Sequence, residues 1–123
     1  MLPAAGQGIV CVVARDDLPE DAMQAFVRMN HAPTETAAHI ERAFLAALDG
    51  SCRTPIAAHT FDRDGEWFVR GQVLALDGQQ VWAAEGTCAK SAPQDALAGL
   101  GAGLAGEIRE AAGGKLPAFG GAW

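Results

Sequence analysis

The sequence predicts an α+β fold: a three-stranded antiparallel sheet packed against two or three helices, preceded by an orphan N-terminal strand. Asp-Gly pairs at 64–65 and 77–78 each separate two apolar runs. This is a strong hairpin signal, because the pair accommodates the positive φ angles of a type I′ turn. Apolar residues at helical spacing flank this region on both sides. The strands are expected at roughly 55–63, 66–76 and 79–88.

The start of the chain combines a lead-in rich in proline and glycine, residues 2–8, with a β-branched run at 9–14. Such a run is typical of a strand buried on both faces, so Cys11 within it is expected in a core. Gly6 and Gly8 allow sharp bends or close approach to a ligand. An ordinary glycine loop is the alternative to such a ligand contact.

The first helix is expected to begin within residues 16–21, where acidic residues and a proline favour a helix start. Met23, Phe26 and Val27 follow at helical spacing and are expected to face the core.

The second helix is expected at 36–48, with Thr34 or Thr36 at its start and an apolar stripe along one side. Glu41 and Arg42 fall off this stripe, and one interpretation is that both are solvated charges.

The third helix is expected to follow a cap at Ser91 and to end at 113–114. Gly101, Gly103 and Gly106 lie inside it. Their mid-helix position does not fit a dinucleotide-binding loop. They are assigned to close packing of the helix on the sheet.

The loop at residues 50–55 joins the second helix to the first strand of the sheet. Gly50 is a natural helix stop, and Pro55 cannot continue a helix. Cys52 is thus placed on a tight loop, at a surface or a cleft. Cysteine usually behaves as a small buried hydrophobe, so this position indicates either thiol chemistry or a buried loop cysteine. The upstream helix end disfavours a thiolate, whereas Arg53 favours it.

Composition narrows the classes of function. The chain has 123 residues and a net charge of −6, which argues against nucleic acid or an anionic membrane surface as partner. No apolar run approaches the roughly 20 residues of a membrane span. The three cysteines lack the spacing of a disulfide framework or a zinc site, so no metal is expected and a reducing cytoplasm fits best.

Two blocks of sequence resemble porphobilinogen deaminase (hydroxymethylbilane synthase). The first comprises residues 40–45 with Leu48, Gly50, Cys52 and 55–57; the second comprises residues 2–8 and closes at 15–17. The resemblance runs over nearly the whole chain but covers only a C-terminal portion of that enzyme. It implies that Cys52 forms a thioether to a dipyrromethane cofactor, with Gly50 and Ser51 beside it and Gln7 bordering the active cleft.

The resemblance also implies an activity for the intact enzyme. Four porphobilinogen molecules are condensed into hydroxymethylbilane, a step of tetrapyrrole (heme and chlorophyll) biosynthesis. The family's catalytic aspartate and arginine cluster lie in N-terminal domains that have no counterpart here. Independently, nine basic residues among fifteen acidic ones do not suffice to bind a polycarboxylate chain.

The resemblance implies that the chain consists of two parts. Residues 1–16 are a lead-in and a strand belonging to a missing N-terminal domain, and residues 17–123 are the C-terminal cofactor-carrying domain. The expected partners are the enzyme's N-terminal domains and porphobilinogen as its substrate. No catalytic residue is expected in this chain, and the isolated chain is expected to be inactive. Glu41 and Arg42 recur in the family, which suggests that they position the helix against another domain.

Two other functions stay open. The first is a non-catalytic α+β interaction module of the same fold without bound cofactor. The second is a thiol-redox protein that uses Cys52 together with Cys88.

Overall fold

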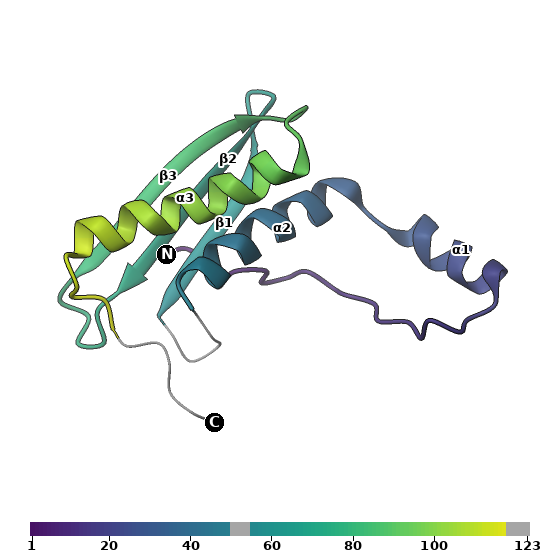
Figure 1. Ribbon diagram of the computed structural model, residues 1–123, viewed down its shortest axis with the longest axis horizontal. Helices are drawn as coiled ribbons and strands as arrows, with labels where there is room; N and C mark the ends of the chain where they lie inside the picture. Colours follow the sequence, from purple (N-terminus) through teal and green to yellow (C-terminus); the bar gives the residue numbers. More distant parts are fainter. Residues whose placement is uncertain (50–54, 118–123) are drawn as a thin grey trace.

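The computed structural model describes residues 1–49 and 55–117, and these residues form three helices and three strands. The helices α2 and α3 cover one face of the sheet, whereas α1 projects away from it (Figure 1). The predicted α+β class is confirmed. In chain order the elements are α1 (Glu20–Met29), α2 (Ala32–Ala47), β1 (Ile56–Arg63), β2 (Glu66–Leu74), β3 (Val81–Ala89) and α3 (Gln94–Ala112).

The sheet is an antiparallel meander in the order β1-β2-β3. At the first hairpin, Asp64 and Gly65 have φ angles of 56° and 86°, which confirms the predicted type I′ turn. The second hairpin differs from the prediction. Only Gly78 of its Asp-Gly pair has a positive φ, and the Ala75 amide donates to the Gln80 carbonyl across a wider loop (2.8 Å). The strands β2 and β3 are therefore shorter at this end than expected.

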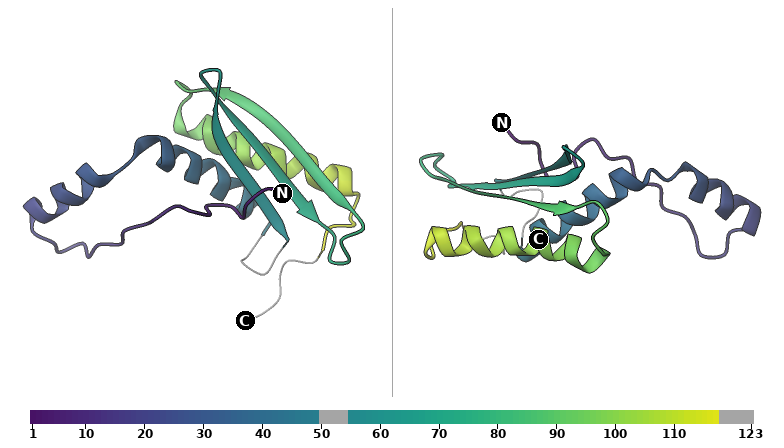
Figure 2. Two further views of the ribbon diagram at one scale, coloured as in Figure 1. Left: turned by 180° about the vertical axis from the view of Figure 1, so that it is seen from behind. Right: turned by 90° about the horizontal axis from the view of Figure 1, so that it is seen from above.

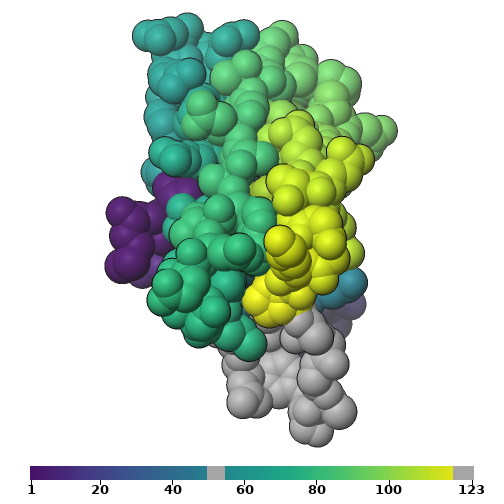
Figure 3. All heavy atoms as spheres, turned by 90° about the vertical axis from the view of Figure 1, so that its left-hand side faces the viewer, coloured from purple at the N-terminus to yellow at the C-terminus, as the bar shows by residue number. Residues whose placement is uncertain are grey.

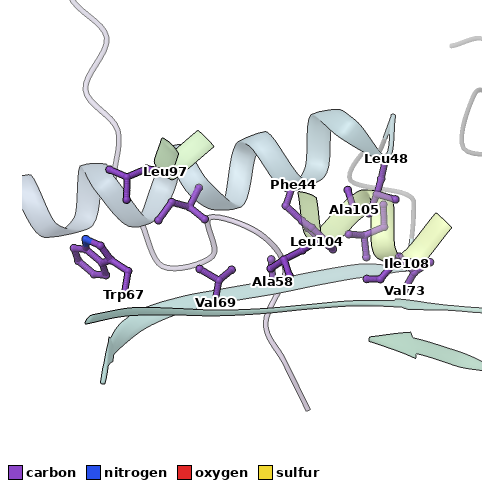
Figure 4. Packing of buried hydrophobic residues seen from close by; sticks show 12 residues of the cluster. Phe44, Leu48, Ala58, Trp67, Val69, Val73, Leu97, Leu104, Ala105 and Ile108 are labelled. Atoms are coloured by element: carbon purple, nitrogen blue, oxygen red, sulfur yellow. The ribbon is translucent and has the colours of Figure 1, made fainter. Parts of the chain in front are cut away.

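The core is one layer of side chains from α2, the sheet and α3 (Figure 4). Phe44 of α2 is fully buried, and its ring lies on the backbone of Gly71, where an added Cβ would be 2.4 Å from the ring. Gly101 of α3 lies against α2, because its Cβ would be 2.3 Å from the Ile40 carbonyl oxygen. The glycine of α3 that packs closely therefore serves a helix–helix contact, so its assignment to helix–sheet packing was wrong.

The ends of the longer helices also differ from the sequence expectations. Helix α2 begins at Ala32, with a proline in its first turn, so neither Thr34 nor Thr36 starts it. The N-cap of α3 is Pro93 without a side-chain hydrogen bond, so the cap predicted at Ser91 is wrong.

The expected strand at 9–14 does not form in the described part of the chain. Val10 and Val13 are each 90% exposed, and Cys11 is exposed instead of buried in a core. A strand needs a hydrogen-bonding neighbour, and this segment runs away from the sheet toward α1 (Figure 2). The start of the chain, before this segment, does contact the sheet, where the Ala58 amide of β1 donates to the Pro3 carbonyl (3.1 Å), on the side away from α3 (Figures 2 and 3).

Helix α1 was expected to face the core, and this expectation is wrong. It has no buried residue, and Phe26 and Val27 are 38% and 58% exposed. The helix lies beyond the N-terminal end of α2, too far from the sheet to join its core (Figure 1). Its apolar side is therefore left largely uncovered by the described chain.

Candidate functional site

The candidate attachment residue Cys52 lies outside the described residues, as do Gly50 and Ser51. The structure does fix both ends of their loop. On one side, Asp49 follows α2 with a φ of 53°, and its amide donates to the Ala46 carbonyl (3.0 Å). On the other side, the Pro55 carbonyl accepts a hydrogen bond from the Leu74 amide (2.9 Å). The loop therefore joins two anchored elements, α2 and β1.

Arg109 of α3 reaches across to the α2 end of this loop. Its Nη2 and Nε atoms donate to the Ala47 carbonyl at 2.7 and 3.2 Å, and Nη2 lies 3.5 Å from the Asp49 carboxylate. The Arg109 guanidinium thus supplies hydrogen bonds to the Ala47 carbonyl, at the negative end of the α2 dipole. Sequence reasoning missed Arg109, whose one signal was a basic residue in the last turn of a helix.

Glu41 of α2 makes contacts that its position off the apolar stripe did not indicate. Its side chain is buried (4% exposed), so the interpretation of Glu41 as a solvated charge is wrong. Oε2 accepts a hydrogen bond from the Gly6 amide and Oε1 accepts one from the Thr60 amide, each at 2.7 Å. One carboxylate of α2 thus holds both the lead-in and β1. Arg42, beside it, is exposed as the interpretation required.

A cleft of about 390 Å³ lies between the lead-in, α2 and β1. Gln7 lies in its lining, but the Gln7 side-chain oxygen accepts a hydrogen bond from the Ala4 amide (3.1 Å) and so closes a turn of the lead-in itself. Lys90 forms an ion pair with Asp62 at the same cleft. The Lys90 hydrogen bond is the main cause that holds the pKa of Asp62 below its usual value.

The described thiols have different surroundings. Cys88 is partly buried in β3, opposite Trp67 of β2, whereas Cys11 is exposed. Burial, and after it the negative charge of Glu66, raises the pKa of the Cys88 thiol. In the same ranges, 1–49 and 55–117, no group of three or more His, Cys, Asp and Glu side chains could hold a metal ion. No helix in those ranges is both long and apolar enough to cross a membrane.

Comparison with known proteins gives a consistent result. The family model of the porphobilinogen deaminase C-terminal domain matches residues 36–110. Porphobilinogen deaminase of Nitrobacter hamburgensis is 43% identical over 94% of this chain and 35% of its own length. The enzyme of Desulforudis audaxviator is 35% identical over 94% of this chain and 36% of its own. A chloroplastic porphobilinogen deaminase of Pisum sativum is 45% identical over 66% and 22%. The chain thus spans about a third, or less, of the length of these relatives.

Proposed function

The chain belongs to the porphobilinogen deaminase family, of which it contains the C-terminal domain, and from this premise we propose that it carries the enzyme's dipyrromethane cofactor. Cys52 is the anchor, through a thioether bond, and Gly50 and Ser51 beside it belong to the cofactor-binding segment. The observation that carries the proposal is the family match over residues 36–110, which includes the loop together with both elements that anchor it.

The anchored ends of the loop support a tethering role. A tether helps a reaction when it holds the growing product at a fixed distance from the reacting groups. Helix α2 and strand β1 both belong to the buried core on either side of the loop. Arg109 further fixes the α2 end. Cys52 therefore acts as an attachment point, not as a general acid or base.

The activity of the whole enzyme follows as the second part of the proposal. Four porphobilinogen molecules are condensed with loss of ammonia, and hydroxymethylbilane is released for tetrapyrrole biosynthesis in the cytoplasm. The carboxylates of the growing chain need several cations. Of the nine basic residues of this chain, Arg15, Arg70, Lys90 and Arg109 each lie within 4.0 Å of a carboxylate of the same chain, which reduces the positive charge available to a polycarboxylate. The cations and the catalytic acid are therefore assigned to the N-terminal domains.

An exposed apolar surface supports docking of those N-terminal domains. Residues 9–12, the end of α1 and the first half of α2 line a groove of about 410 Å³, in which Val10, Phe26 and Met29 lie. Their exposed fractions are 90%, 38% and 69%. Exposed apolar side chains rimmed by polar ones, here including Glu35 and Arg42 of α2, are typical of an interaction site. The relatives are about three times as long as this chain, and their additional part is the proposed occupant.

The experiment joins this chain to the N-terminal part of a relative, which this chain does not span. This chain is produced alone, and also fused after the N-terminal two-thirds of the Nitrobacter hamburgensis relative, and both proteins are incubated with porphobilinogen. Hydroxymethylbilane is expected from the fusion and not from the chain alone. A folded fusion that forms no product, with an unmodified Cys52, favours the non-catalytic module over an enzyme domain.

A further inference from the structure

The carboxylate of Glu41 joins three segments that are distant in the sequence. It lies in the middle of α2 and accepts hydrogen bonds from Gly6 in the lead-in and from Thr60 in β1, which are 35 and 19 residues away. The Glu41 side chain is almost completely withdrawn from water. Burial of a carboxylate is tolerated when hydrogen-bond donors satisfy both of its oxygens. Here both donors are backbone amides.

One more hydrogen bond and a turn of the backbone fix the same part of the lead-in. The Ala58 amide of β1 donates to the Pro3 carbonyl (3.1 Å). Between Pro3 and the exposed run 9–14 the chain turns through Gly6 and Gly8, whose φ angles are +72° and +83°. These angles strain residues other than glycine. The Gly6 amide is thereby presented to the carboxylate by a defined turn of the backbone.

We propose that Glu41 is a positioning residue that clamps the lead-in to the cofactor-carrying domain and sets the direction in which the chain enters it. The same helix carries Glu41 at its middle and the attachment loop at its carboxyl end. A displacement of the lead-in is therefore transmitted to the loop through one rigid element. This consequence for the loop rests on the function proposed above, whereas the clamp itself does not.

Amide hydrogen exchange, followed by NMR on the 123-residue chain, tests the clamp. In the unsubstituted chain the Gly6 amide is expected to be protected, in contrast to the exposed Gly8 amide. In Glu41→Gln, one oxygen is replaced by an NH₂ group that cannot accept a hydrogen bond. Exchange at Gly6 is then expected to accelerate about tenfold or more, the change that follows loss of a charge-assisted hydrogen bond. Glu107→Gln, at an exposed position of α3, is the matched control.

A double-mutant cycle separates a clamp from simple packing support between α2 and β1. Glu41→Gln is compared in the full chain and in a variant that lacks residues 1–8, by urea unfolding. If Glu41 is a clamp, Glu41→Gln raises the unfolding equilibrium constant by a factor that is about ten times smaller in the variant without residues 1–8. In that variant Gly6, one of the two partners of Glu41, is already absent.

Equal effects in both backgrounds would overturn the proposal, as would a Gly6 amide that exchanges as fast as Gly8 in the unsubstituted chain. The second result needs no variant, so a Glu41→Gln chain that does not fold leaves the test intact. Neither readout involves Cys52 or porphobilinogen. Failure of the clamp is thus distinguishable from failure of the proposed function.

Discussion

At the scale of single residues, the surroundings of Cys88 control the reactivity of its thiol. Burial is the larger cause of its raised pKa, and the Glu66 carboxylate adds to it. A raised pKa keeps more of the group in the thiol form at neutral pH, and the thiolate is the nucleophile. Cys88 is therefore a poor candidate for the redox function that the sequence left open.

Replacement of Glu66 by glutamine is expected to lower the pKa of Cys88, because it removes a negative charge that disfavours the thiolate. Alkylation of Cys88 at neutral pH should then accelerate about two- to threefold, a small change because solvent screens the charge. Mass mapping after timed reaction with iodoacetamide gives the rate at each cysteine. Cys11, which is exposed, serves as the internal control. An unchanged rate at Cys88 would show that Glu66 does not act on the thiol.

Glu41 and Arg109, two charged residues near the candidate site, show what could not be predicted from sequence for single residues. The periodicity of α2 correctly separated Glu41 from the apolar stripe. It gave no information on what faces the polar side, because Gly6 and Thr60 come from other segments. Arg109 and Ala47 are 62 residues apart, so their contact likewise depends on the fold. The loop at 50–55 was predicted from Gly50, Cys52 and Pro55, which lie close together in the sequence, and it stays a prediction because residues 50–54 lie outside the described part of the chain.

At the scale of elements, the contact between α2 and α3 depends on one glycine. Gly101 and Gly103 are both inside α3, but only Gly101 faces a neighbouring backbone. Gly103 has nothing within 4 Å of an added Cβ. The two positions therefore form a matched pair, in which the same substitution has opposite consequences.

Gly101→Ala is expected to destabilise the domain by about 1–3 kcal/mol, because the methyl group would overlap the Ile40 carbonyl. Gly103→Ala is expected to stabilise it by about 0.5–1 kcal/mol, because alanine favours a helix interior over glycine. Urea unfolding of both variants measures these differences. Equal signs for the two substitutions would contradict the packing described for α3.

Elements stabilised within the domain were predictable from sequence, and elements without a partner here were not. The turn at Asp64-Gly65 was predicted correctly, whereas the same local signal at Asp77-Gly78 predicted the hairpin but not its turn type. The run at 9–14 and the apolar side of α1 have the patterns of buried elements, yet both are largely exposed. Sequence periodicity indicates that a face will be covered but does not identify what covers it.

At the scale of the whole molecule, a compact sheet-and-helix body is joined to an extended apolar arm formed by residues 9–14 and α1. The arm contributes nothing to the core, so the body does not need it for stability. Its exposed side chains are instead available to the rest of the enzyme. Stability and assembly should therefore respond separately to changes in the arm.

The double variant Val10→Lys, Val13→Lys tests this separation. Both side chains are 90% exposed, so the unfolding free energy of the isolated chain should change by no more than about 0.5 kcal/mol. In the fusion with the Nitrobacter hamburgensis N-terminal part, the buried lysines should abolish most of the activity. Leu76→Lys, at a position that is 80% exposed on the far hairpin, is the control and should leave both properties unchanged. Full activity in the double variant would show that the arm is not the docking surface.

The central claim is that one sulfur atom carries the pyrrole primer. Intact-mass measurement of the fusion protein, followed by peptide mapping, tests it most directly. We expect the added mass of two linked pyrrole units on the peptide that contains Cys52, and none in Cys52→Ser, while Cys88→Ser remains loaded. A folded fusion whose Cys52 peptide has its unmodified mass, or a primer found on another residue, would contradict the account.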